Sequence, residues 1–285
     1  MRLNKNLESL NIYRNYKNSL VENASSLNRI STGVKINSAK DNPNKIGMSE
    51  GLRLQIRSLQ MAEKNIQDGV SMIQTFDGAL GSVSESLSRI KELTVKAGGA
   101  NSDDDLAIIQ NEIDQLKADV DYTANNTEFN GIKLLNSDSV SDNNKPRFLN
   151  HTIGSTKDED VKIPIFDIRT NMLKDDQGNY LSDLDVTDKS KMDSNLSSVD
   201  GAIRTISTIR GKYGAVQNRL EDASLNLSSS SLNLEKTESR IRDTDVALEM
   251  SEYAKSSLLI ETSIGLMQQS NNFPKDILRI LENIK

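Results

Sequence analysis

Residues 239–250, SRIRDTDVALEM, form a charge-dense stretch in which side-chain chemistry is conceivable. It contains Arg240, Arg242, Asp243, Asp245 and Glu249. Such a cluster could be a catalytic acid and base, a network of ion pairs, or the exposed face of a helix. At helical spacing Arg242 attracts Asp245, whereas Asp245 repels Glu249 unless a neighbour supplies a cation. The elements that carry these residues decide which description holds.

The rest of the sequence offers little for catalysis or for a cofactor. His151 is the single histidine and cysteine is absent, which excludes an HExxH zinc motif, a catalytic triad, thiolate sites and disulfides. GAVQ and GGAN lack the spacing of a phosphate loop, and KDDQGNY lacks the regularly spaced oxygen ligands of a calcium loop. We therefore expect no enzyme activity, no cofactor and no metal.

The composition indicates long helices instead of a large globular core. Of the 285 residues, 4% are aromatic and 27% are charged, and the formal net charge is -6. No basic block is present to neutralise phosphates, which argues against a nucleic-acid partner. No apolar stretch is long enough to cross a bilayer and the N-terminus lacks a signal-peptide core, so we expect no membrane insertion. Export would then require a dedicated secretion machine.

Apolar residues recur every seven positions in both halves of the chain. This spacing is typical of long helices packed lengthwise, and a helix over residues 46–97 would be about 75 Å long. The first row lies at 59, 66, 73, 80 and 87, and the second at 199, 206, 213, 220, 227, 234, 241 and 248. Since Ile241 and Leu248 continue the second row, we expect residues 239–250 to continue the second long helix.

Shorter elements are predicted between these helices. Gly98 and Gly99 should end the first helix, and Ser102 or an adjacent aspartate should cap a third helix that begins in SDDDL. Asn130-Gly131 predicts a hairpin turn into a strand. Periodicity is lost over residues 137–191, where Pro164 suggests an edge strand in VKIPIFDI.

The predicted fold is mainly α. We expect a long, coiled-coil-like antiparallel helical bundle formed by the N- and C-terminal arms, with a small β-hairpin or irregular insertion. Both ends of the chain are amphipathic, and neither can bury its apolar face alone. Contacts between subunits are expected at Leu3, Leu7, Leu10, Leu27, Ile30, Arg240, Arg242, Asp243, Asp245, Ile264, Ile277 and Leu281.

Several long motifs, in the right order, resemble those of bacterial flagellin. At the N-terminal end they are SLNRISTGVKINSAKDN, QIRSLQMAEKNIQDGVSMIQTFDGAL, SRIKELTVKA and NTEFNGIKLL. At the C-terminal end they are RGKYGAVQNRLEDASLNL, ESRIRDTDVALEMSEYAKSSLL and FPKDILRILENI. The resemblance covers roughly residues 1–136 and 195–285.

The resemblance implies a secreted, extracellular subunit that polymerises with itself into the flagellar filament. Residues 1–43 with 251–285 would form an inner tube, residues 44–136 with 192–250 an outer tube, and 137–191 a short insertion. The implied partners are further copies of the chain, the flagellar type III export apparatus, a flagellin chaperone, the filament cap and the hook-associated junction proteins. The terminal segments would stay disordered in the exported monomer and fold between neighbours at the growing tip.

The resemblance also implies recognition of the monomer by Toll-like receptor 5. The matching positions are Arg89 and Leu93 in SRIKELTV and Glu112 in IIQNEIDQL. Taken without the resemblance, the two charges could be ordinary surface residues and Leu93 ordinary packing.

The chain departs from the flagellin pattern after KINSAKD, where NPNKIGMS replaces a run of small residues. Asp41, Asn42 and Pro43 are similar to the hook–filament junction protein of the same superfamily, which is the main alternative. A secreted coiled-coil adaptor would share the heptads but not the motifs IRDTD and FPKDILRIL. Within the flagellin interpretation, residues 240–245 are predicted to set the register of subunit stacking.

Overall fold

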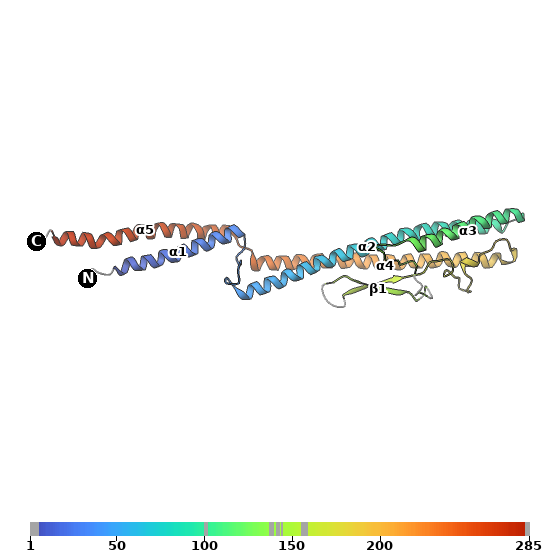
Figure 1. Ribbon diagram of the computed structural model, residues 1–285, viewed down its shortest axis with the longest axis horizontal. Coiled ribbons are helices and arrows are strands. Elements are labelled where there is room, and N and C mark those ends of the chain that lie inside the picture. Colours follow the sequence, from blue (N-terminus) through green and yellow to red (C-terminus); the bar gives the residue numbers. More distant parts are fainter. Residues whose placement is uncertain are drawn as a thin grey trace. The chain divides into compact units, whose positions relative to one another are not determined.

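The computed structural model describes residues 6–99, 102–136, 140, 143, 145–154 and 159–282 (Figure 1). The chain divides into two compact units, one made of Met1–Ile56 with Leu232–Lys285 and the other of Arg57–Ser231. Five long α-helices and one two-stranded sheet make up most of the described residues. The predicted fold class, a mainly helical chain with a small β element, is confirmed.

Several of the helix ends coincide with strong local signals in the sequence. They are α1 (Leu7–Thr32), α2 (Pro43–Ala97), α3 (Asp103–Asn126), α4 (Met192–Arg242) and α5 (Val246–Glu282). Helix α2 has 55 residues and ends directly before Gly98. Ser102 caps α3 through a reciprocal capping box with Asp105, as the sequence predicts.

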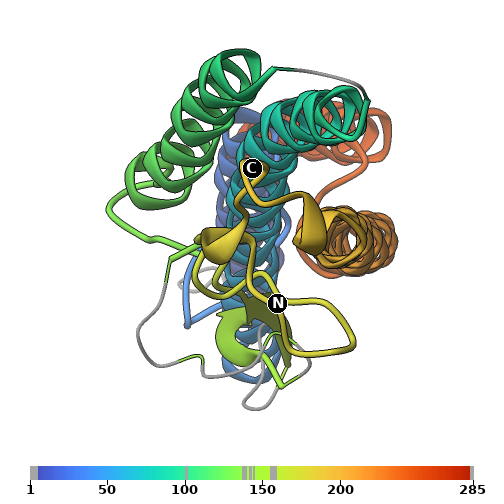
Figure 2. The same cartoon turned by 90° about the vertical axis from the view of Figure 1, so that its right-hand side faces the viewer.

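The unit Arg57–Ser231 is a helical bundle with a continuous apolar core. Viewed from its end, α2, α3 and α4 lie along one side of the unit, and the loops and sheet that follow α3 lie on the side that the helices leave open (Figure 2). Ion pairs Arg89–Glu112 and Lys91–Asp200 join α2 to α3 and to α4. The core residues of the heptad rows are fully or almost fully buried: Ile66, Ile73, Leu80, Leu87, Val199, Ile206, Tyr213 and Leu220.

The segment between α3 and α4 contains the sheet and two short 3-10 turns. Strand β1 (Arg147–Thr152) pairs antiparallel with β2 (Asp160–Ile165), and the turns are η1 (Leu181–Asp183) and η2 (Lys189–Lys191). Pro164 lies in β2 opposite Phe148, so the predicted edge strand is confirmed. The tight turn at Asn130-Gly131 is also present, with φ 50° and 76°. The strand predicted to follow it is wrong, because only an isolated bridge joins Phe129 to Ile132.

This segment is more than a peripheral insertion. Its apolar residues belong to the bundle core, with the Phe166 ring 5.6 Å from that of Tyr213 on α4 in an edge-to-face arrangement. Gln110 on α3 accepts from the backbone N–H of Val186, and Asn195 on α4 donates to the Asp185 carbonyl. Although this segment has no regular apolar spacing, it contributes buried residues to the core, and side-chain hydrogen bonds from α3 and α4 hold its backbone in place.

One prediction about the long helices is wrong. Residues 239–250 do not continue α4, which ends at Arg242, and α5 starts at Val246. The backbone at the break pairs with a second segment: Lys35 N–H donates to the Arg242 carbonyl (2.6 Å) and Thr244 N–H to the Gly33 carbonyl (3.1 Å). These contacts between residues far apart in sequence override a local heptad pattern.

Candidate functional site

Helices α1 and α5 lie side by side and antiparallel, with the chain termini at the same end (Figure 1). The most buried side chains between them are small or polar: Ser19, Ser26, Glu249, Ser256 and Ser263. We call this contact the α1–α5 seam. Half-buried Ile12, Tyr16, Ile260 and Met267 flank the serines.

Most of the large apolar side chains of the pair are exposed to solvent, away from the seam. Leu7 and Leu258 each keep 64% of their surface exposed, and Phe273 keeps 60%. The other exposed members are Leu10, Tyr13, Leu20, Val21, Leu27, Val246, Leu248, Met250, Leu259, Ile264 and Leu266. The pair is thus inverted relative to an ordinary two-helix contact, which buries its leucines. Exposed apolar surface on this scale marks an interaction surface.

The predicted assembly residues fall largely on this outer surface. Leu7, Leu10, Leu27 and Ile264 are exposed, while Ile30 is half-buried. Leu3 lies outside the described residues. Ile277 and Leu281 belong to α5, but their side chains are outside the described set. Their role in assembly stays a prediction.

Polar side chains join the two helices across the seam. The Asn23 amide donates to Ser256 Oγ (3.0 Å), Ser257 Oγ (2.9 Å) and the Tyr253 carbonyl (3.4 Å). Nearer the chain ends, the Asn6 amide donates to the Ser270 carbonyl (2.9 Å) and to Ser270 Oγ (3.0 Å). Neither asparagine could be singled out from the sequence, because an asparagine in a polar helix carries no signal of a distant partner.

Both helical arms of this unit break at the same level. We call residues 33–42 and 243–245 the joint. Gly33 ends α1 in the left-handed conformation (φ 69°), and Val34 forms an antiparallel bridge with Asp243. Asp245 begins α5 as an N-cap, accepting from Ala247 N–H (3.0 Å) and Leu248 N–H (3.3 Å).

Ion pairs stabilise the joint on both sides. Arg242 Nη1 lies 2.9 Å from Glu50 Oε1 of α2, and Arg29 Nε lies 3.2 Å from Glu249 Oε2. The hydrogen bond from Arg242 holds the pKa of Glu50 below its ordinary value. The predicted Arg242–Asp245 attraction is wrong, because Arg242 turns toward Glu50 while Asp245 caps α5.

The other two charged residues of the stretch point elsewhere. Asp243 accepts a hydrogen bond from Ser239 Oγ (2.6 Å), and Arg240 is exposed. Glu249 is buried in the seam beside Arg29, so the expected repulsion with Asp245 is offset by that cation. The cluster is a set of caps and ion pairs at a helix break.

The loop of the joint is organised by Asp41. Its carboxylate accepts from the backbone N–H groups of Ser38 (3.0 Å) and Asn37 (3.1 Å), which hold its pKa below the ordinary value. Asn42 then caps α2 by accepting from Lys45 N–H, and Pro43 is the first residue of that helix. The unusual sequence at 41–43 thus has a local structural use.

The residues expected to contact a receptor lie on α2 and α3. Arg89 Nη2 and Nε donate to Glu112 Oε1 at 2.8 and 3.0 Å, and Nη1 donates to Glu92 at 3.1 Å. The hydrogen bond to Glu112 raises the pKa of Arg89. Leu93 is 2% exposed and belongs to the bundle core, so only the two charges present their side chains to solvent.

His151 packs on helix α2. Its Nε2 lies 2.6 Å from the Asn65 carbonyl oxygen. A Cβ on Gly69 would come within 2.9 Å of the same ring nitrogen, so the glycine leaves room for the imidazole. The ring anchors β1 to α2.

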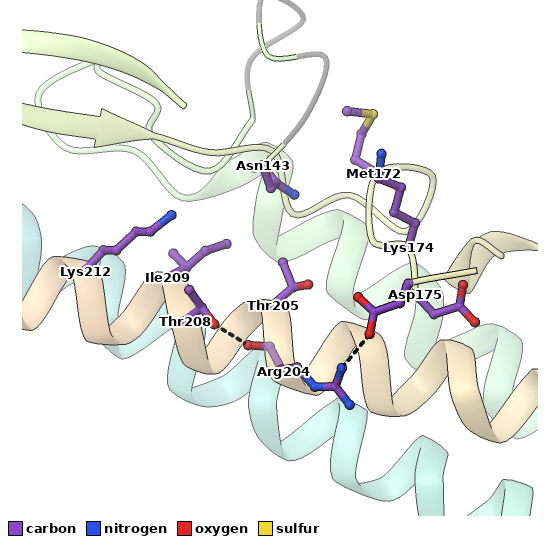
Figure 3. Close-up of a pocket in the computed structure, with 10 residues that line it drawn as sticks. Asn143, Met172, Lys174, Asp175, Arg204, Thr205, Thr208, Ile209 and Lys212 are labelled. Carbon is purple, nitrogen blue, oxygen red and sulfur yellow. Dashed lines mark hydrogen bonds and ion pairs between the residues drawn. The ribbon is translucent and has the colours of Figure 1, made fainter. Parts of the chain in front are cut away.

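A hollow of about 170 Å³ lies between α4 and the loops that precede it (Figure 3). Arg204 on its rim pairs with Asp176 (2.8 Å), and Lys212 Nζ lies 5.2 Å from the centre of the Phe166 ring. Asp175 accepts from the N–H groups of Gln177 and Asn179. Arg204, Lys212 and Asp175 are thus engaged with other groups of the protein.

Across the described residues, no helix has an apolar run long enough to span a bilayer, and no three metal-ligating side chains come together.

The sequence matches two family models. The N-terminal helical region of bacterial flagellin matches residues 3–139, and the C-terminal helical region matches residues 196–281. The chain is 38% identical over 303 residues to a flagellin of Bacillus subtilis (strain 168), with 99% of this chain and 100% of the relative covered. It is 33% identical to the flagellar filament 30.7 kDa core protein of Treponema maltophilum, with 90% of each covered.

A solved structure shares the fold. The putative flagellar hook-associated protein from Vibrio parahaemolyticus superimposes with a TM-score of 0.61 at 14% identity, covering 71% of this chain and 100% of the other. At that identity the likeness concerns the fold alone.

Proposed function

The chain belongs to the bacterial flagellins, the structural subunits of the flagellar filament, and on this premise we propose that α1 and α5 fold when subunits assemble. The inverted α1–α5 pair is the observation that carries the proposal. Its serine-lined seam buries few large apolar groups, while its leucines face outward. Ordering a residue costs about 1 to 2 kcal/mol in backbone entropy, and this seam offers little to offset that cost.

Neighbouring subunits supply the missing surface. Covering one exposed Leu or Phe side chain contributes about 1.5 to 3 kcal/mol. The outward residues of α1 and α5, among them Leu7, Leu258 and Phe273, would be covered by equivalent helices of adjacent copies. Contacts that do not close into a ring generate a helical filament, which agrees with the flagellin family.

The joint connects the terminal helices α1 and α5 to the ends of α2 and α4 within the same compact unit. The Val34–Asp243 bridge fixes the two chain segments to each other, and Arg242–Glu50 ties the end of α4 to the start of α2. We therefore assign Arg242, Asp243 and Asp245 a role in subunit stacking that depends on backbone pairing and capping. Arg240, which is exposed, would contribute through charge on the outer surface.

Deletion of residues 250–285 tests the assembly mechanism. The truncated chain should form no filaments by electron microscopy, while the bundle Arg57–Ser231 keeps its helical circular dichroism and cooperative melting. The full-length chain polymerised in parallel is the control. Filaments of normal length from the truncated chain would refute the mechanism.

Export and accessory partners follow from the same proposal. A monomer with unfolded ends can enter a narrow type III channel, and a flagellin chaperone would cover the exposed apolar residues of α5 before export. The cap and the hook-associated junction proteins would meet the same helices at the two filament ends. Secretion of the chain from a strain lacking its own flagellin, and its loss when the export apparatus is disabled, would test this route.

Recognition of the monomer by Toll-like receptor 5 is a separate proposal. Arg89 and Glu112 form an exposed ion pair on α2 and α3, and buried Leu93 would act by keeping the two helices packed. A reporter-cell assay with Arg89→Ala and Glu112→Ala should show strongly reduced signalling, with Lys91→Ala as a nearby charge control. Full signalling by an Arg89→Ala, Leu93→Ala, Glu112→Ala triple variant that remains folded would remove this function.

The two family models and the flagellin relatives favour the filament subunit over the hook–filament junction protein, which residues 41–43 suggested as the alternative. Polymer length tests this assignment: purified chain should form long filaments, and short segments that need another subunit to extend would contradict it.

A further inference from the structure

We infer that Pro274 and Asn6 together set the register of α1 against α5. Pro274 lies inside α5, which continues to Glu282. A proline has no N–H, so the Ser270 carbonyl, four residues earlier, loses its usual donor within the helix. The Asn6 amide, 2.9 Å away, donates to that same carbonyl.

The two polar atoms of the Asn6 side chain have different partners. Its Oδ1 accepts from Ser9 N–H (3.1 Å) and so caps α1, which leaves the amide nitrogen free to reach α5. Ser270 Oγ accepts from the same nitrogen at 3.0 Å. One side chain therefore ties the first turn of α1 to the single carbonyl of α5 that the proline releases.

The packing of serines does not by itself determine the register of α1 against α5. Serines recur at seven-residue spacing on both helices, at Ser19 and Ser26 on α1 and at Ser256, Ser263 and Ser270 on α5. Sliding α1 by seven residues would again place serine beside serine. A polar residue with one specific partner is the usual device that excludes such slipped pairings.

Only the observed register lets both Asn6 and Asn23 make their hydrogen bonds to α5. Asn6 contacts Ser270 and Asn23 contacts Tyr253, and the separation along the chain is the same on the two helices. After a seven-residue slip, Asn6 would face Ser263, whose carbonyl can accept from Met267 N–H within the helix. The freed carbonyl at Ser270 would then be left without its donor.

We call the contact between Asn6 and the Ser270 carbonyl, together with Pro274, the register lock. It rests on the proposed function, because the terminal helices are expected to fold in the filament. The lock would fix the position of the outward leucines of α1 relative to those of α5 along the helix axes, so that every copy offers its neighbours the same surface. In a subunit paired in a slipped register, the leucines of α1 would be displaced along the helix axis relative to those of α5.

Distance measurement between two spin labels tests the lock. The chain has no cysteine, so Glu22→Cys and Gln269→Cys, both at exposed positions, give two unique labelling sites far apart along the pair. Labelled subunits are diluted into filaments of unlabelled parent chain. The parent should give one narrow distance. Pro274→Ala and Asn6→Asp should each add a second population displaced by about 10 Å, the rise of seven helical residues.

Matched controls separate the lock from general damage. Lys275→Ala changes α5 next to the proline, and Asn11→Asp adds the same charge to α1, and both should keep the parent distance. Pro274→Ala raises intrinsic helix propensity, so a merely structural proline predicts no loss of order. A single unchanged distance in both lock variants would overturn the inference, as would equal disorder in the controls.

If the variants are incorporated into filaments too poorly for distance measurement, a double-variant cycle on the incorporated fraction provides a second test. Pro274→Ala gives the Ser270 carbonyl a competing donor within α5, and Asn6→Asp removes the donor on α1. Both changes weaken the same contact, so the fraction of the double variant incorporated should match that of the worse single variant. Additive losses of incorporation would overturn the lock. Failure of the parent chain to polymerise, or a narrow distance in the free parent monomer, would instead contradict the proposed assembly mechanism.

Discussion

The bundle Arg57–Ser231 and the α1–α5 pair are both made of long helices, but they place their large apolar side chains on opposite sides. In the bundle, Ile73, Phe76 and Leu80 are fully buried, and polar groups face outward. In the pair, serines lie in the seam, and leucines such as Leu7 and Leu258 face outward. The bundle can stabilise itself, whereas the pair needs neighbours to cover its leucines. On the proposed mechanism, one chain combines a unit that folds alone with a unit that folds on assembly.

A core truncation in the bundle should have the largest effect. Phe76→Ala removes a ring with no exposed surface, and the free energy of unfolding of the monomer should fall by about 3 to 5 kcal/mol. Thermal or urea unfolding measures the loss. A change below about 1 kcal/mol would contradict the view that the bundle is the self-sufficient unit.

The matched truncation in the pair should leave the monomer unchanged. Leu258→Ala, at a residue 64% exposed, should alter monomer unfolding by less than about 0.5 kcal/mol. Polymerisation should suffer instead, with the critical concentration rising about tenfold or more, because about 1.5 to 3 kcal/mol of burial is lost. Sedimentation of filaments gives this value. Equal critical concentrations for parent and variant would show that this face stays exposed in the filament.

The joint should show an intermediate effect. Asp245→Lys removes the cap of α5 and places a cation at the positive end of the helix dipole, with an expected cost of about 1 to 2 kcal/mol to α5. Filament formation should weaken while bundle melting stays near the parent value. Asp245→Asn, which can still cap, is the control. Equal loss of bundle stability and polymerisation would count against a specific role for the joint.

Acid should weaken the joint slightly. Hydrogen bonds from Arg242 and from the backbone of Ser38 and Asn37 hold the pKa values of Glu50 and Asp41 below their ordinary 4.5 and 3.8. A depressed carboxyl pKa adds stability above the ordinary value, and this is lost as the pH falls through the folded-state value. Filaments should therefore dissociate more readily below about pH 4. Glu50→Gln should make that dependence shallower in sedimentation assays, and an unchanged pH profile would exclude Glu50 as a contributor.

Much of the fold could be predicted from local patterns. The seven-residue rows predicted the long helices, the Ser102 cap predicted α3, and Asn130-Gly131 predicted a tight turn, because each signal acts within a few residues. The buried role of residues such as Phe166 and Leu181 was missed, since irregular backbone has no period to reveal its inward face. The break at residues 243–245 was missed because its hydrogen-bond partners lie about two hundred residues earlier in the chain.

By itself, the sequence determined the helical class, the positions of the long helices and the flagellin motifs, since periodicity and composition are local properties of the chain. Tertiary structure decided which face of each terminal helix lies inward, where α4 gives way to α5, and which groups pair across the seam. A heptad repeat fixes the spacing of a row of residues but not its partner. Only the folded chain brings Asn6 to Ser270 and Arg242 to Glu50.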